Sequence, residues 1–168
     1  AEKGWRVTVV DNFDPYYDRR IKEANIAGHI VAPGYRLIEA DLCDADLEER
    51  LGPDPIDLIV HIAAKAGVRP SIADPLAYHR VNVTGTLRLL ELARHRKIPR
   101  FVLASSSSVY GENPNVPWKE DERGLVPISP YAASKLAAEQ FARVYAQLHG
   151  LHVTVLRFFT VFGPRQRP

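Results

Sequence analysis

The chain has 168 residues, 46% hydrophobic and 25% charged, with a formal net charge of +2. This composition is typical of one soluble globular domain, and a small net charge of mixed signs argues against a nucleic-acid-binding face. No apolar run approaches the roughly 18 residues that a membrane-spanning helix needs. The single cysteine, Cys43, cannot form an internal disulfide, which fits a reducing cytoplasm. The sequence contains no Cys/His cluster of the kind that would indicate a metal site.

The first predicted strand covers residues 5–10 and ends at Asp11, after residues 1–4 that have the pattern of a helix tail closed by Gly4. In dinucleotide-binding folds, an acidic residue at the end of the second strand binds the adenosine ribose, and a glycine-rich phosphate loop lies about 20 residues earlier. Counting back that far from Asp11 passes residue 1. We therefore expect the first strand and its phosphate loop to lie upstream, which would make the sequence a fragment. A plain turn residue is the alternative for Asp11.

Strands and helices alternate along the rest of the chain, and this order predicts a parallel sheet with helices on both faces. Short apolar runs indicate the strands and longer amphipathic stretches indicate the helices. The predicted strands cover 35–40, 56–62, 100–104 and 151–158, and the predicted helices cover about 19–28, the segment up to 51, 75–96 and 130–149.

Small and polar residues stand at several of these boundaries. Ala63 and Ala64 follow the strand at 56–62, where small side chains would let a flat ligand approach the backbone. Four serines follow the strand at 100–104. Because open parallel sheets bind ligands at the carboxyl ends of their strands, we favour a ligand site there over a low-complexity turn. His61 lies inside an apolar strand and is predicted to be a core residue rather than a ligand.

The segment 129–135 predicts the start of a helix, with Ser129 as the capping residue and Pro130 at the first helical position, and Gly150 predicts its end. Four-residue spacing places Tyr131 and Lys135 on one helical face. A lysine ammonium one turn away favours the phenolate form of a tyrosine, so this pair suits a general base. An ordinary amphipathic helix with a surface tyrosine and lysine is the alternative.

Taken together, these motifs resemble those of the extended short-chain dehydrogenase/reductases, in the branch of nucleotide-sugar epimerases and dehydratases. The likeness covers essentially the whole sequence and rests on motifs in the right order. They are Asp11-Asn12, Asp41-Leu42, Ala63-Ala64, the Ser106 tract before Val109-Tyr110-Gly111, Tyr131 with Lys135, and Arg157-Phe158-Phe159-Thr160. The resemblance implies an α/β, Rossmann-type, doubly wound parallel sheet. Residues 1–168 would form a partial NAD(P)-binding domain that lacks its first strand and the carboxyl-terminal substrate lobe.

The resemblance also implies roles for individual residues. The expected catalytic set is Ser106, Tyr131 and Lys135. The expected contacts to NAD are Asp11, Asn12, Asp41, Leu42, Ala63, Ala64, Lys65, Asn82, Tyr131, Lys135 and Phe158. The expected contacts to a UDP-sugar are Arg69, Ser106, Ser107, Ser108, Thr160 and Arg167.

Within that branch, the sequence is most similar to UDP-glucuronate 4-epimerases. Thr160 stands where galactose-type epimerases usually have asparagine, and hydroxyls together with the Arg167 fork suit a sugar carboxylate. Ser107 and Ser108 replace the acidic pair of sugar 4,6-dehydratases, so the proton shuttle for eliminating water is missing.

Other functions remain open at this point. They are a 4-epimerase for neutral UDP-sugars, a UDP-glucuronate decarboxylase, a non-catalytic dinucleotide-binding module, and a fragment that is inactive alone. Members of the family commonly dimerise, so the resemblance also implies a homodimer of the full-length protein, with the helices at 75–96 and 130–149 as candidates for the interface.

Overall fold

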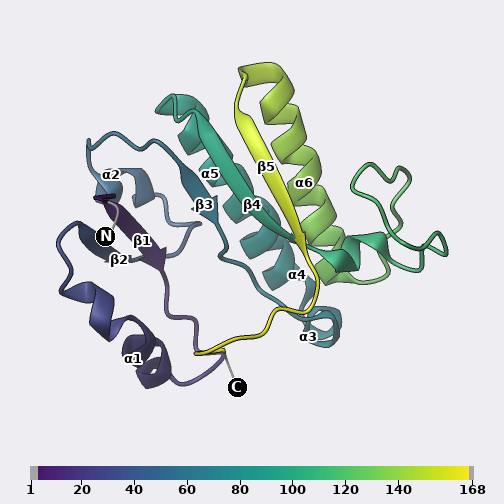
Figure 1. Cartoon of the computed structure of the whole chain (residues 1–168), viewed down its shortest axis with the longest axis horizontal. Coiled ribbons are helices and arrows are strands. Elements are labelled where there is room, and N and C mark those ends of the chain that lie inside the picture. The colour runs from purple at the N-terminus through teal and green to yellow at the C-terminus, as the bar shows by residue number, and fades with distance from the viewer. Residues whose placement is uncertain (1–3, 167–168) are drawn as a thin grey trace. The chain divides into compact units, whose positions relative to one another are not determined.

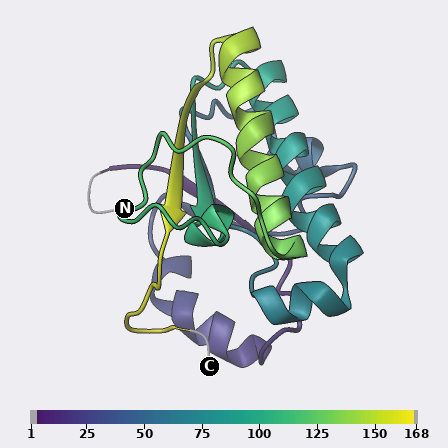
Figure 2. The same cartoon turned by 90° about the vertical axis from the view of Figure 1, so that its right-hand side faces the viewer.

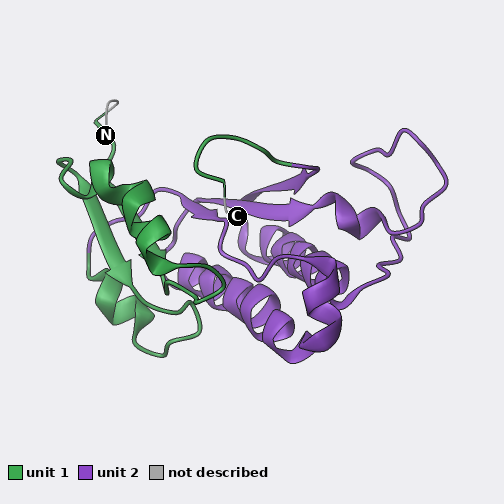
Figure 3. Cartoon of the chain, turned by 90° about the horizontal axis from the view of Figure 1, so that it is seen from below, with its two compact units in different colours: residues 1–53, 161–168 green, residues 54–160 purple. Residues whose placement is uncertain are grey.

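The computed structural model describes residues 4–166. The predicted helix tail before Gly4 and the predicted substrate contact Arg167 lie outside the described residues. The chain forms two compact units (Figure 3): one contains residues up to Pro53 together with those from Val161 onward, and the other is Asp54–Thr160.

The first unit contains a two-stranded parallel sheet of β1 (Val7–Asp11) and β2 (Tyr35–Glu39), with Val9 paired to Leu37. These strands match the prediction closely. Helix α1 (Arg19–Ile30) runs two residues past its predicted end, and the Asp18 carboxylate caps it by accepting from the Arg20 amide. Helix α2 (Leu47–Leu51) buries both of its terminal leucines.

The second unit contains a three-stranded parallel sheet in the order β3 (Ile59–His61), β4 (Arg100–Ser106) and β5 (His152–Phe158), which lie side by side in Figure 1. Strand β3 is shorter than predicted. The middle strand carries the core of this unit, since Phe101 and Leu103 are essentially inaccessible to solvent. Parallel pairing brings the ends of the strands to one edge, so that Ser106 lies opposite Phe158.

Two long helical runs cover one face of this sheet (Figure 2). The predicted helix at 75–96 is present as α4 (Pro75–Tyr78), a π-helical turn η1 (His79–Thr84) and α5 (Gly85–His95). Helix α6 (Pro130–His149) has the predicted bounds. The Ser129 hydroxyl accepts from the Ala132 amide at 3.1 Å, and Gly150 adopts φ of 66° beyond the last turn.

Two short elements were not predicted: helix α3 (Val68–Ala73) and the 3-10 turn η2 (Ser107–Tyr110). Each is too short to show a helical period in the sequence.

The strands form two sheets, where the sequence predicted one. In the described part of the chain, no strand pairs with both β1 and β3, so the ladder does not continue between them. Val60, in the middle of β3, is 54% exposed.

Across residues 4–166, no helix combines the length and apolar character required to cross a bilayer. A search of the same residues for three or more His, Cys, Asp or Glu side chains gathered around a possible metal position also finds none.

Candidate active site

The serines that follow β4 form a ledge, which we define as Ser106, Ser107 and Ser108. Ser106 has an extended backbone with φ of −148°, and its hydroxyl accepts from the Ser108 amide at 3.2 Å, which starts the turn η2. The Ser106 and Ser108 hydroxyls also bond to each other at 3.2 Å. The three predicted ledge residues therefore lie together, and Phe158 of β5 pairs with Ser106.

Lys135 of α6 contacts the end of β4, just before this ledge. Its ammonium donates to the Ala104 carbonyl at 2.8 Å, two residues before Ser106, and the residue is only 6% exposed. Burial lowers the pKa of Lys135 from 10.5 to about 8, while the Glu139 carboxylate acts in the opposite direction. A charged lysine is thus buried against the strand that leads to the predicted catalytic serine, where the low-dielectric surroundings strengthen its electrostatic effect.

Tyr131 lies in the first turn of α6 and is only partly buried. Its backbone amide donates to the Ser71 hydroxyl at 3.0 Å, and Ser71 in turn donates to the Val68 carbonyl at 2.6 Å. The Tyr131 ring packs edge-on against Tyr78, with ring centroids 6.1 Å apart. The unpredicted helix α3 and helix α4 therefore fix the start of α6, and the predicted base is not turned into the interior.

Asn82 lies in the π-helical turn and is 2% exposed. Its side-chain amide accepts from the Lys65 amide at 2.8 Å, and donates to the Lys65 carbonyl at 3.0 Å and to the Ser134 hydroxyl at 2.9 Å. A π-helical turn inserts an extra residue and often marks a functional position. Here it aims Asn82 at the turn after β3, so Asn82 holds this turn against the helix that carries Tyr131.

His61 is a core residue, as predicted. Its Nε2 lies 2.9 Å from the Thr86 hydroxyl, which donates its own proton to the Asn82 carbonyl at 2.6 Å. Because that proton is already used, Thr86 accepts from His61, which assigns the neutral tautomer with hydrogen on Nε2. Burial, together with the Lys135 charge, lowers the pKa of His61 to about 4, so the ring is uncharged at neutral pH.

The other predicted residues of this unit lie at the ends of its elements. Ala63 is exposed and Ala64 and Lys65 are half-buried in the turn after β3, as expected for a surface that a ligand approaches. Arg69 is exposed on α3, and Phe158 and Thr160 are exposed at the end of β5. The substrate roles of Arg69 and Thr160 stay predictions.

The first unit gathers the four residues predicted to bind the adenosine end of NAD at the carboxyl ends of its strands. Asp11 accepts from the Phe13 amide at 2.7 Å, and Asn12 donates to the Asp41 carboxylate at 3.3 Å. Asp41 also accepts from the Cys43 amide at 2.8 Å, which places Leu42 between them. Phe13, at φ of 50°, turns the chain sharply after β1.

Sequence reasoning missed a buried ion pair behind the ledge. The Glu139 carboxylate on α6 accepts from the Arg157 guanidinium on β5 at 2.8 Å, and their side chains are 8% and 17% exposed. It also accepts from the Ser105 hydroxyl at 2.5 Å. The sequence contained one clue, because Glu139 follows Lys135 by one helical turn and shares its face.

Comparison with known proteins shows the family of the chain. Residues 1–168 match the NAD dependent epimerase/dehydratase family along the entire chain. The chain belongs to this family. Its fold is accordingly of the Rossmann type, as in the solved structures that it matches, and NAD is the cofactor of the family.

Named relatives narrow the comparison. This family member is 42% identical over 168 residues to UDP-glucuronate 4-epimerase 3 of Arabidopsis thaliana, covering 99% of the chain and 39% of that protein. It matches the solved UDP-glucuronic acid 4-epimerase from Bacillus cereus, in complex with UDP-glucuronic acid and NAD, with a TM-score of 0.90 and 35% identity over 99% of this chain and 52% of that one. The UDP-N-acetylglucosamine 4-epimerase from Methanobrevibacter ruminantium M1, in complex with UDP-N-acetylmuramic acid, gives a TM-score of 0.86 and 38% identity over 96% and 49%. The chain thus spans about half the length of these proteins, or less.

The residues of this chain fit NAD in both units, considered separately. In the first unit, Asp11 presents an exposed carboxylate at the end of a parallel strand, the position from which ribose hydroxyls are held. In the second unit, the small residues Ala63 and Ala64 leave the backbone accessible, and the Lys135 ammonium is held at the end of β4 by the Ala104 carbonyl. These residues suit the two ribose-containing ends of a dinucleotide.

Proposed function

We propose that the protein to which this chain belongs is an NAD-dependent nucleotide-sugar 4-epimerase that acts on UDP-glucuronate. One observation carries the proposal: the buried Lys135 ammonium donates at 2.8 Å to the carbonyl of Ala104, two residues before Ser106, and the partly buried Tyr131 lies one turn earlier on the same helix. This placement supports Tyr131 as the proposed general base, with Lys135 as the cation on the same helical face.

In the proposed mechanism, Tyr131 as phenolate takes the proton from the 4-hydroxyl of the sugar, and Ser106 holds the same oxygen by a hydrogen bond. The Lys135 ammonium favours the phenolate and would also bind the nicotinamide ribose. Oxidation of C4 to a ketone and its reduction from the other face are the hydride chemistry that bound NAD supplies. Tyr131 then returns its proton to the epimerised alcohol, so that there is no net redox change.

The preference for a uronate rests on hydroxyl and guanidinium donors. Ser107 and Ser108 are half-buried in the ledge and Thr160 is exposed beyond β5, so their hydroxyls suit a carboxylate acceptor. Arg69 and Arg167 would add charge. A 4-keto uronate is a β-keto acid that readily loses carbon dioxide, so donors that hold its carboxylate in an unfavourable orientation would protect the intermediate.

Replacing Tyr131 with phenylalanine tests the proposal. The complete gene product carrying Tyr131→Phe should lose turnover of UDP-glucuronate by on the order of 10³-fold, because the proton acceptor is removed while the ring packing remains. Binding of NAD and of the nucleotide sugar, measured by calorimetry, should change little. Tyr35→Phe removes the same hydroxyl from a residue outside the predicted catalytic set and should keep full activity. A Tyr131→Phe enzyme that keeps a near-native rate would reject the assignment.

A 4-epimerase for neutral or N-acetylated UDP-sugars is the second candidate, and the relative from Methanobrevibacter ruminantium at 38% identity favours it. Turnover of UDP-glucuronate, UDP-glucose and UDP-N-acetylglucosamine by the protein with Thr160 intact or changed to asparagine separates the two candidates. Carbon dioxide release would instead indicate a decarboxylase, and NAD binding without turnover a non-catalytic module. A homodimer and a cytoplasmic location stay predictions.

A further inference from the structure

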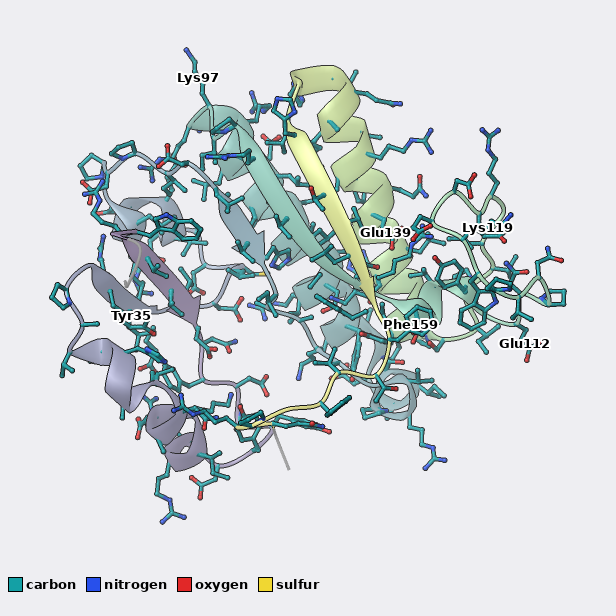
Figure 4. The ribbon with its side chains drawn as sticks, in the orientation of Figure 1. Tyr35, Lys97, Glu112, Lys119, Glu139 and Phe159 are labelled. Atoms are coloured by element: carbon teal, nitrogen blue, oxygen red, sulfur yellow. The ribbon has the colours of Figure 1, made fainter. Side chains whose placement is uncertain are left out.

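The buried ion pair between Glu139 and Arg157 joins three elements at the end of the sheet. Glu139 lies on the side of α6 that faces β5 (Figure 4), and Arg157 of β5 donates to it from Nε at 3.1 and 3.2 Å and from a terminal nitrogen at 2.8 Å. Ser105 of β4 donates to the same carboxylate at 2.5 Å. One buried carboxylate thus ties both strands to the helix of Tyr131 and Lys135.

The residues on β4 explain why this matters for the site. Ala104, Ser105 and Ser106 are consecutive. The first accepts from Lys135, the second donates to Glu139, and the third is the predicted catalytic serine. Lys135 and Glu139 are four residues apart on one face of α6, so the helix makes hydrogen bonds to two consecutive residues at the end of the strand. A shift of α6 along β4 would break both bonds and change the position of Ser106 relative to α6.

Arg157 extends the same network toward the segment after the ledge. Its other terminal nitrogen donates to the Tyr110 hydroxyl at 3.2 Å and to the Glu120 carbonyl at 3.3 Å. The Tyr110 ring stacks on Trp118, which stacks on Phe159 at the end of β5. The ion pair therefore lies beneath a packed aromatic cluster, which explains its low exposure.

Glu139 offsets part of the positive charge in this buried group. Lys135 and Arg157 are cationic and Glu139 is anionic, so the three carry one net positive charge. Another titratable group whose pKa is affected by Lys135 is His61 from β3, which is neutral at neutral pH. Tyr131 lies four residues before Lys135 on the same helical face. Removing Glu139 leaves two buried cations without an anion, whereas removing Arg157 leaves a lysine and a carboxylate that neutralise each other.

We propose that Glu139 and Arg157 are positioning residues of this active site: together they hold the serine end of β4 against α6 and set the charge balance around the Lys135 ammonium. The inference rests on the proposed function for its kinetic consequences only, because the geometry and the charge balance exist without substrate. Neither residue needs to touch the sugar or the cofactor.

Titration of Lys135 in charge variants tests the electrostatic part. The complete gene product is labelled with ¹³C at the lysine side chains, and the Lys135 signal is assigned by its loss in Lys135→Met. Glu139→Gln should make Lys135 titrate at lower pH than in the unaltered protein, and Arg157→Met should make it titrate at higher pH. The double variant, which restores one net positive charge, should return the midpoint close to the unaltered value. Shifts in the same direction, or no shift, would overturn the proposal.

Kinetics test the positioning part. Arg157→Lys keeps the charge but loses the two-pronged guanidinium contact, so it should leave the Lys135 titration unchanged and lower kcat by on the order of 10-fold, with KM within about threefold. If Glu139→Gln does not fold, Ser105→Ala removes only the link from β4 to the carboxylate and should lower kcat in the same way. Loss of thermal stability with unchanged kcat would show a purely structural role and overturn the proposal.

A matched control is available on α1. Glu23 pairs with Arg19 at 2.7 Å, but the side chains are 49% and 51% exposed. Glu23→Gln makes the same chemical change in a solvated pair and should alter neither the titration nor kcat. Because the titration needs no substrate, failure of the proposed function is a separate result: an unaltered protein that epimerises no UDP-sugar would reject the function and leave the lysine shifts to be judged alone.

Discussion

Lys135 is expected to destabilise the fold that it serves, and replacing it with methionine should reveal this cost. The residue is almost fully buried with its ammonium bound to one backbone carbonyl. Burial of the charge lowers its pKa in the folded protein from 10.5 to about 8. Methionine keeps the unbranched stem and removes the charge, so Lys135→Met should make the protein more stable at neutral pH.

The size of the effect follows from the difference between the two pKa values. Each pH unit between 8 and 10.5 corresponds to about 1.4 kcal/mol, so burying the charged lysine costs about 3 kcal/mol. Below pH 8 both folded and unfolded chains are protonated, and the folded protein bears the full cost. Between pH 8 and 10.5 the folded state releases its proton first, so the stability of the unaltered protein rises with pH. Losing the hydrogen bond to Ala104 offsets about 1 kcal/mol of this gain, so the free energy of unfolding of Lys135→Met should exceed that of the unaltered protein by about 2 kcal/mol at pH 7.

Urea unfolding at pH 7 and at pH 10 measures this difference. The advantage of Lys135→Met should fall by about 2 to 3 kcal/mol between the two conditions, and subtraction of the two proteins cancels all groups that they share. Lys119→Met is the control, because the Lys119 side chain points into solvent (Figure 4) and should show no such change. A Lys135→Met protein that is less stable at pH 7, or a difference that is constant with pH, would refute the reasoning.

Two further predictions concern the same unit. Gly111 has φ of 60°, and an added Cβ would lie 2.1 Å from the Val126 carbonyl oxygen, so Gly111→Ala should cost about 2 to 4 kcal/mol in urea unfolding. Gly124 has φ of 69° with nothing within 4 Å, so Gly124→Ala should cost only about 1 kcal/mol, and equal costs would contradict the steric argument. Burial lowers the pKa of His61 in the folded protein from 6.5 to about 4. As the pH falls from 6.5 to 4, the His61 ring therefore binds a proton in the unfolded chain but stays neutral in the folded protein, and the folded state loses stability. Between pH 7 and pH 4.5 the unaltered protein should therefore lose about 2 to 3 kcal/mol more stability than His61→Gln, and equal losses would show that His61 does not titrate as a buried group.

Much of the fold could be predicted from the sequence because its signals are local. Helix α6 has its start, its end and the common face of Tyr131 and Lys135 encoded in a capping serine, a proline, a glycine and a four-residue spacing. The strands followed from short apolar runs. The serine ledge followed from its place after β4, since the ends of parallel strands meet at one edge.

The rest depended on which distant side chains meet, and no local pattern records that. The hydrogen bond between Ser71 and the Tyr131 amide joins residues 60 positions apart in the sequence. The bond from Lys135 to Ala104 joins residues 31 positions apart, and the contact between Arg157 and Glu139 joins residues 18 apart. The division of the strands into two sheets likewise follows from hydrogen-bond partners and not from the strands themselves. By itself, the sequence determined which groups are available for the chemistry. Only the tertiary structure decided which of them are buried, paired and charged, because desolvation and ion pairing arise where separate elements pack together.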